Sequence, residues 1–157
     1  MSRIYTVIFD NVAVTAAQDL YELLAGSANP IVLHRLTLTQ NSEIGDAQDE
    51  QLRVTIKRVT GAPTSGSGGS APTPRPVDQG DAAAAFTAEV NNTTQLSGGT
   101  SVTLHSEAWN VRAGMDYFPA PEQRFTFQIS TRCVASLDAA PADSVSMHGT
   151  AVIEELT

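Results

Sequence analysis

The chain has 157 residues, of which 41% are hydrophobic and 17% are charged, and its formal net charge is −8. This composition excludes a disordered chain, and at this length roughly two thirds of the unfolded surface can be buried without disulfides or a structural metal. The acidity argues against a protein that coats nucleic acid, because phosphate binding depends on clustered Lys and Arg.

The first sixty residues contain three segments that are typical of β-strands. Residues 3–9 (RIYTVIF) are rich in β-branched and aromatic side chains and end at the turn pair Asp10-Asn11. Residues 31–40 alternate apolar and polar side chains in their second half, and residues 51–59 repeat this alternation. A period of two predicts strands with one buried face.

Residues 14–26 (VTAAQDLYELLAG) carry two conflicting signals. Thr15 and Gln18 have the spacing of a helix capping box, and the three leucines lie on one helical stripe. A five-residue turn nevertheless joins this segment to the strand that begins at 31, as in a β-hairpin. Because sheet context often overrides a weak local preference, we favour a strand at 16–25 and keep a helix as the alternative.

The second half of the chain contains four further short strand candidates. They lie at 101–105, 124–129, 133–137 and 146–154, and Gly- or Pro-containing turns separate them. Residues 81–90 favour neither helix nor strand. With the doubtful segment at 16–25 included, the sequence predicts an all-β fold, an antiparallel β-sandwich that is jelly-roll-like and has about eight strands.

A long Gly/Ser/Pro loop, residues 61–76 (GAPTSGSGGSAPTPRP), interrupts this series of strands. Each flank holds too few strands to close a sandwich alone, so we expect one domain that spans 1–157. The Gly/Ser half is expected to be mobile. The Pro-rich half favours an extended path that costs little entropy when it docks on a neighbour. We therefore predict an arm whose protein-contact residues are Pro72, Pro74, Arg75 and Pro76.

The residue types of metal and cofactor sites are few and dispersed. Cys133 is the only cysteine, lies in an apolar run, and is expected to be a small buried hydrophobe. His34, His105 and His148 each lie in a predicted strand, and no two have the spacing of a ligand pair. No metal site and no cofactor are predicted.

Two further segments have compositions that occur in ion- or phosphate-binding loops. Residues 43–50 (EIGDAQDE) carry four carboxylates, but they lack the alternating aspartates of an EF-hand loop, so a solvated acidic loop is favoured over a calcium site. The Gly-rich run lacks the Lys-Ser or Lys-Thr end of a phosphate loop. No catalytic residues are predicted, and an enzyme is the least supported class.

Residues 109–122 form a loop-like stretch that is rich in aromatic side chains. Packing of Trp109, Tyr117 and Phe118 under one end of the sandwich is the favoured interpretation, because aromatic residues dominate core area. The alternative is a contact with another protein that includes Arg112, since Trp, Tyr and Arg are common interface anchors. In a carbohydrate-binding sandwich, Trp109 or Tyr117 would serve as the stacking platform.

Five turn and strand motifs are spread along the chain: TAAQDL at 15–20, SGSGG at 65–69, NNTT at 91–94, PEQR at 121–124 and GTAVIEE at 149–155. Their combination resembles that of small structural proteins of tailed phages and prophages. The resemblance covers nearly the whole chain. It implies a non-enzymatic virion protein with a jelly-roll fold, foremost a capsid cement (decoration) protein, with a tail-associated structural protein as the alternative.

The resemblance also implies partners and a location. A cement protein binds the major capsid protein and copies of itself, and it stabilises the head. The sequence shows neither a secretory signal nor a run of transmembrane length, so we expect synthesis in the bacterial host cytoplasm and a place on the capsid surface. Neither nucleic acid nor a membrane is an expected partner.

Overall fold

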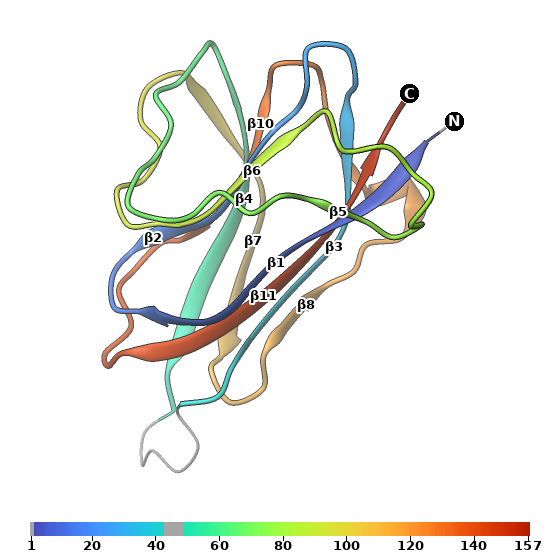
Figure 1. The fold of residues 1–157 in the computed structure, drawn as a ribbon. Helices are drawn as coiled ribbons and strands as arrows, with labels where there is room; N and C mark the ends of the chain where they lie inside the picture. Colours follow the sequence, from blue (N-terminus) through green and yellow to red (C-terminus); the bar gives the residue numbers. More distant parts are fainter. Residues whose placement is uncertain (1, 43–48) are drawn as a thin grey trace.

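The computed structural model describes residues 2–42 and 49–157, which form two antiparallel sheets packed as a β-sandwich (Figure 1). The elements are β1 (Arg3–Val14), β2 (Gln18–Leu24), β3 (Ile31–Gln40), β4 (Gln51–Thr60), β5 (Arg75–Pro76), β6 (Thr87–Asn92), β7 (Thr100–Asn110), β8 (Met115–Tyr117), the 3-10 turn η1 (Pro121–Gln123), β9 (Phe125–Phe127), β10 (Arg132–Leu137) and β11 (Val145–Glu155). The predicted all-β sandwich is confirmed.

The strand order is that of a jelly roll. The first sheet has the order β5-β1-β11-β3-β8, with β9 also paired to β3, and the second has the order β6-β2-β10-β4-β7. Outside residues 61–99, the chain crosses from one sheet to the other at β1 to β2, β2 to β3, β3 to β4, β7 to β8, β9 to β10 and β10 to β11. The C-terminal strand β11 therefore lies between β1 and β3, and β10 lies between β2 and β4.

Three short strands raise the number above the eight predicted. β5 lies in the Pro-rich loop, β6 overlaps the end of the segment 81–90 that favoured neither state, and β8 lies in the aromatic stretch. Strands of two to six residues that pair along a sheet edge show too little alternation to be recognised in sequence.

The ambiguous segment is the strand β2, as favoured, and a β-bulge explains its helical appearance. Ala135 lies opposite Tyr21 while Ser136 lies opposite Asp19, so Leu20 is the extra residue of the bulge. The bulge allows Leu20, Tyr21 and Leu23 all to belong to the core. The resulting spacing of three resembles one face of a helix.

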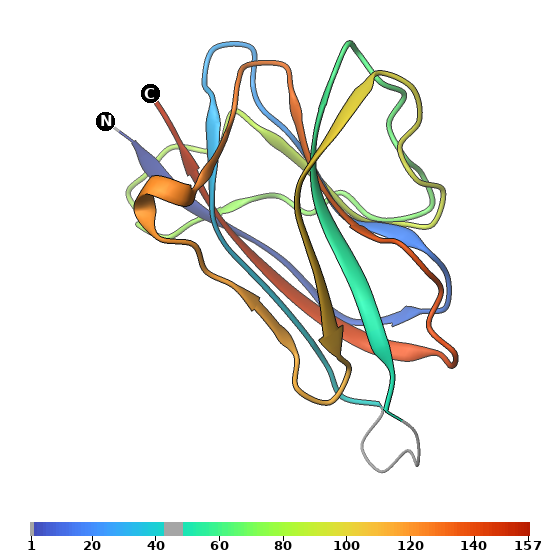
Figure 2. The ribbon, with the colours of Figure 1, turned by 180° about the vertical axis from the view of Figure 1, so that it is seen from behind.

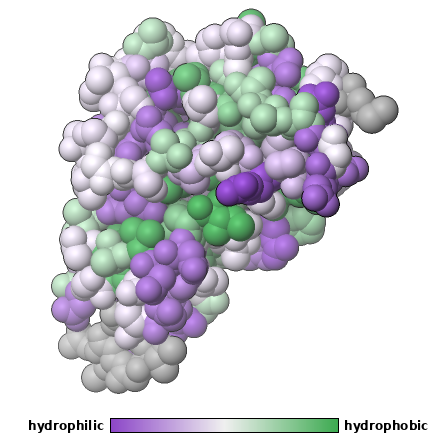
Figure 3. Space-filling view, viewed as in Figure 1, coloured by the Kyte–Doolittle hydropathy of each residue, from purple (hydrophilic) through white to green (hydrophobic). Residues whose placement is uncertain are grey.

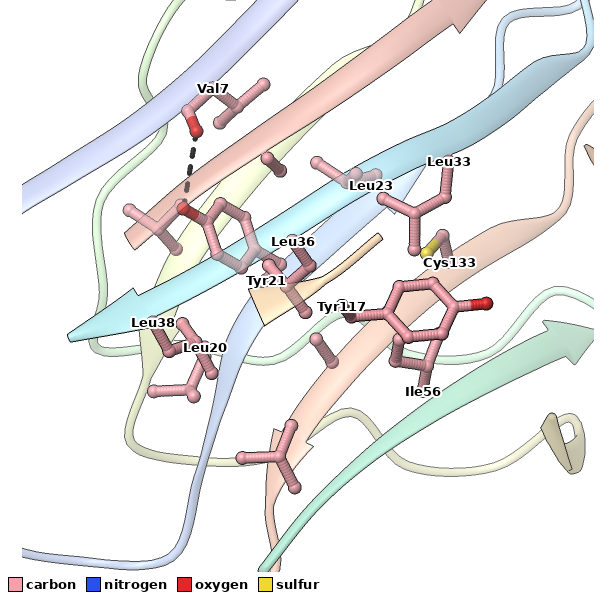
Figure 4. Close-up of a cluster of buried hydrophobic side chains, with 14 of the residues drawn as sticks. Val7, Leu20, Tyr21, Leu23, Leu33, Leu36, Leu38, Ile56, Tyr117 and Cys133 are labelled. Atoms are coloured by element: carbon pink, nitrogen blue, oxygen red, sulfur yellow. Dashed lines mark hydrogen bonds between the residues drawn. The ribbon is translucent and has the colours of Figure 1, made fainter. Parts of the chain in front are cut away.

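One hydrophobic core fills the space between the sheets. Figure 4 shows Cys133 near Leu33 and Tyr117 in this core, and Cys133 is 2% exposed. The prediction of a buried, hydrophobic cysteine is confirmed, and burial raises the pKa of its thiol. The Tyr21 hydroxyl donates a hydrogen bond to the Val7 carbonyl at 3.3 Å, which satisfies the one polar group of that ring.

Residues 61–99, between β4 and β7, form an insertion that adds one strand to each sheet. β5 pairs with β1, and β6 pairs with β2. Two limbs of the insertion lie side by side beyond β2 (Figure 1), joined by bridges that link Thr64 to Ser97, Ser67 to Thr94 and Ser70 to Val90. The segment predicted as a mobile arm thus lies on its own domain, because its backbone hydrogen bonds are made there.

Candidate functional site

The predicted contact residues of the Pro-rich segment lie mainly against their own domain. Pro74 is buried, and Pro72 and Pro76 are half-buried. Arg75 is exposed and lies opposite Thr6 in the ladder between β5 and β1. Of this group, Arg75 presents the most surface to another molecule.

Trp109 and Tyr117 are core residues, as the favoured packing interpretation required. Their exposed fractions are 3% and 8%. The Tyr117 ring packs 4.5 Å from the His105 ring and stacks on Phe125 at 5.9 Å, measured between ring centroids. The suggestion that either ring is a platform for a sugar is therefore wrong, because both are covered.

Arg112 and Phe118 are exposed, as a contact role requires. The Arg112 Nε atom lies 3.1 Å from Asp49 Oδ1, and Phe118 is 66% exposed. The Arg35 guanidinium lies 5.5 Å from the centroid of the Phe118 ring, which it partly covers. Arg112 lies in the turn after β7 and Phe118 lies after β8, in separate loops.

Among the described residues, the largest gathering of exposed aliphatic side chains is on the outer face of the first sheet, and it was not predicted. Ile4 is 38% exposed, Ile8 is 52% exposed and Val77 is 63% exposed. Val77 lies beside Ile4, whose carbonyl accepts a hydrogen bond from the Val77 amide at 2.8 Å. Val152 lies opposite Thr6, diagonally between the two isoleucines. We call these four residues the aliphatic strip.

Figure 3 shows this face, with hydrophobic surface over β1 and β11 and hydrophilic residues around it. A signal for the strip exists in the sequence. Residues 3–9 are apolar at almost every position instead of alternating with polar ones, which is typical of a strand that is covered on both faces. The inner face of β1 meets the core, and its outer face has no cover among the described residues.

Each end of the aliphatic strip is bordered by a pair of a histidine and a carboxylate. His34 Nε2 lies 2.6 Å from Glu154 Oε2, and His148 Nδ1 lies 2.6 Å from Asp10 Oδ1. A hydrogen bond from the Ser2 side chain, with a smaller contribution from His34, keeps the pKa of Glu154 below its ordinary range despite partial burial. Both histidines lie in strands, as predicted, and each has a carboxylate partner.

Three buried carboxylates hold the insertion on the domain. Glu22 accepts hydrogen bonds from Ser65 Oγ at 2.7 Å and from the Gly66 amide at 3.0 Å, and it pairs with Arg132. Asp19 accepts the Leu96 amide at 2.7 Å. The third carboxylate, Glu155, accepts the amides of Ala85 and Phe86 at 2.7 Å and 3.2 Å.

Two of the three carboxylates come from β2, and they dock the two limbs separately. Glu22 binds the limb that follows β4, and Asp19 binds the limb that precedes β7. Burial raises the pKa of Asp19 above its ordinary value, although hydrogen bonds from Ser136 and Leu96 oppose the shift. The outer face of β2 is therefore an internal contact of the domain.

The glycines of the insertion serve close packing. A Cβ atom on Gly69 would lie 2.1 Å from the Val90 carbonyl oxygen, and one on Gly66 would lie 2.6 Å from the Thr94 carbonyl oxygen. Real Cβ atoms do not approach so closely, so side chains at these positions would separate the limbs. Flexibility was inferred from the Gly/Ser composition, but these two glycines let two backbones approach each other.

The part of the chain that the structure describes holds neither a cluster of three metal-ligating side chains nor a membrane-spanning helix. No three His, Cys, Asp or Glu side chains within 2–42 and 49–157 are grouped to hold a metal ion. No helix in the same ranges has the length and hydrophobicity needed to cross a membrane. Most of the predicted acidic loop, residues 43–48 of 43–50, lies outside the described residues.

Comparison with known proteins adds no family. No family model, no curated protein and no solved structure matches this chain.

Proposed function

We propose that the chain is a non-enzymatic structural protein of a phage particle, a capsid cement protein that binds the major capsid protein and stabilises the head. The observation that carries the contact is the aliphatic strip on the outer face of the first sheet. Contiguous exposed apolar surface on a folded domain marks an interaction site. The phage setting rests on the resemblance of the turn and strand motifs.

The surroundings of the strip support a contact with protein. Its centre is aliphatic, and its ends carry His34 with Glu154 and His148 with Asp10. Arg75 adds a cationic group beside Thr6. An apolar centre inside a polar rim is the usual anatomy of a protein interface, and Arg is enriched there.

The docked insertion supports the same role. Three buried carboxylates hold the insertion on the domain, and its strand β5 pairs with β1, which widens the pleated surface beside the aliphatic strip. A preformed surface loses less conformational entropy when it binds than a flexible arm does. The proposed contact is therefore a face of the sandwich, with Arg75 as the one member of the predicted arm that lies on it.

The test is binding of the purified chain to heads that lack it, taken from the phage or prophage that encodes it. The variant is Ile8→Asp, and the matched control is Ile129→Asp, because Ile129 is 47% exposed but lies in the turn after β9. We expect the control to bind like the wild type and Ile8→Asp to bind at least about tenfold more weakly, since a carboxylate would be desolvated at the contact.

Two outcomes would change the proposal. Equal binding of the two variants would remove the strip from the contact. If purified particles carry the chain only on their tails, the proposal becomes a tail-associated structural protein. That alternative shares every feature described for the chain.

A further inference from the structure

The four sheet edges of the sandwich differ in how they are protected. β5 has two residues and includes a proline, and β8 and β9 have three residues each. The free side of β6 is bridged by Ser70, which pairs with Val90. Short edges, prolines and covering segments are the devices that keep a sheet from pairing with another chain.

β7 lacks most of these devices. It is eleven residues long, contains no Pro, Lys or Arg, and has Glu107 as its only acidic residue. Within the described residues it pairs with β4 alone, and Figure 2 shows it beside β4 at the side of its sheet. Its one irregularity is a bulge at Leu104, between the pairs Ile56 with His105 and Lys57 with Thr103. The segment that follows Leu104 is a regular and unpaired edge.

The inner side of this edge borders a groove of about 340 Å³. His105 and Glu107 line the groove from β7, and their side chains lie 3.1 Å apart, from Nε2 to Oε2. The other wall comes from Tyr117, Phe118 and Phe125. A strand added to β7 would make backbone hydrogen bonds along the edge and place alternate side chains over this groove.

We propose that β7 pairs antiparallel with β7 of a second copy, about a two-fold axis that passes between the two Ser106 residues. The five-stranded sheets of the two copies would then form one continuous sheet. This inference does not depend on the proposed function, because it concerns the isolated chain. The β7 edge also belongs to the five-stranded sheet, whereas Ile4, Ile8 and Val152 of the aliphatic strip lie on β1 and β11 of the other sheet.

Charge complementarity selects both the partner and the register. In the continuous sheet, the inner faces of both copies lie on the same side, and residues that are directly opposite each other share a face. The two-fold axis is then perpendicular to the sheet, and one residue of β7 lies opposite the same residue of the second copy. With Ser106 at that position, His105 lies opposite Glu107 of the second copy, and Glu107 lies opposite His105 of the second copy. A register centred on Glu107 would oppose two carboxylates, and one centred on His105 would oppose two imidazoles.

The first test is a cysteine crosslink in the purified full chain. Ser106→Cys places two thiols directly opposite each other, at a separation close to what a disulfide needs. Ser101→Cys is the matched control, because Ser101 is exposed on the same strand but would lie opposite position 111. The native Cys133 is buried and does not compete. We expect a disulfide-linked dimer from Ser106→Cys under oxidising conditions and none from Ser101→Cys.

The second test is a charge exchange that is followed by sedimentation and thermal unfolding. Glu107→Lys would place a cation opposite His105 of the second copy, and we expect the dimer dissociation constant to rise by about tenfold. His105→Glu combined with Glu107→Lys restores opposite charges and is expected to restore the dimer. A wild-type chain that stays monomeric at high concentration, or equal crosslinking of the two cysteine variants, would overturn the inference.

Discussion

The outer faces of β1 and β2 differ in residue type and in burial. β1 presents Ile4 and Ile8 to solvent, whereas β2 buries Asp19 and Glu22, which are 2% and 1% exposed. The carboxylates are tolerated because amides, hydroxyls and Arg132 satisfy them. The two isoleucines stay 38% and 52% exposed, so packing within the domain does not account for them. The outer face of β2 is therefore completed within the chain, whereas the outer face of β1 stays exposed, which is why we propose it as the contact with a partner.

The largest expected effect is on the buried side of this comparison. Glu22→Ala leaves Arg132, Ser65 and the Gly66 amide without their shared acceptor. Removing one member of a buried ion pair costs roughly 3 to 5 kcal/mol, and we expect that loss in the free energy of unfolding measured with urea. Asp49→Ala, which removes an exposed partner of Arg112, is the control and should cost less than about 1 kcal/mol.

A smaller loss is expected from separating the two limbs of the insertion. Gly69→Ala brings a Cβ atom against the Val90 carbonyl, and overpacking of this kind costs about 1 to 3 kcal/mol. Limited proteolysis would show faster cleavage within 61–76. Gly80→Ala is the control, since its nearest contact is the flexible Asp78 side chain at 3.4 Å. Equal protease resistance of the two variants would contradict the close-packing role of Gly69.

The pH dependence of stability tests the burial of Asp19. Because its pKa is raised in the folded state, the folded protein holds this proton more tightly than the unfolded chain does. The contribution of Asp19 to stability is therefore greatest below its ordinary pKa of 3.8 and falls as the pH rises through the raised value. We expect the unfolding free energy of the wild type, relative to Asp19→Asn, to decrease over that interval. A constant difference would show that Asp19 is not desolvated.

The smallest stability effect belongs to the open face. Ile8→Thr should change the free energy of unfolding by less than about 0.5 kcal/mol, because the side chain is half exposed and Thr suits a strand. The same variant should weaken binding to heads. A large loss of stability would mean that Ile8 packs within the domain, and it would remove the contrast between β1 and β2.

Sequence patterns predicted the parts of the fold in which one strand face is buried. The strands predicted at 31–40, a segment that alternates in its second half, and at 51–59 are confirmed as β3 and β4. β2 was harder to predict because a bulge at Leu20 changes its period, and only the short turn before β3 favoured a strand. β5, β6 and β8 depend on edge pairing with distant residues, which no local pattern contains.

The candidate site was less predictable than the fold. Aromatic residues favour both cores and interfaces, so Trp109 and Tyr117 were weighed as contacts although both are buried. A Gly/Ser-rich composition predicts mobility, yet the same glycines are needed where two backbones touch. The exposed isoleucines of β1 could not be distinguished from buried ones, because exposure depends on whether a second layer covers the sheet.

The most direct test of the proposed role is cryo-microscopy of purified particles from the source of this chain. We expect a sandwich present in a fixed ratio to the major capsid protein, with the β1 and β11 face against the capsid lattice and the insertion away from that contact. Absence of the chain from the particle, or a contact made by another face, would contradict it.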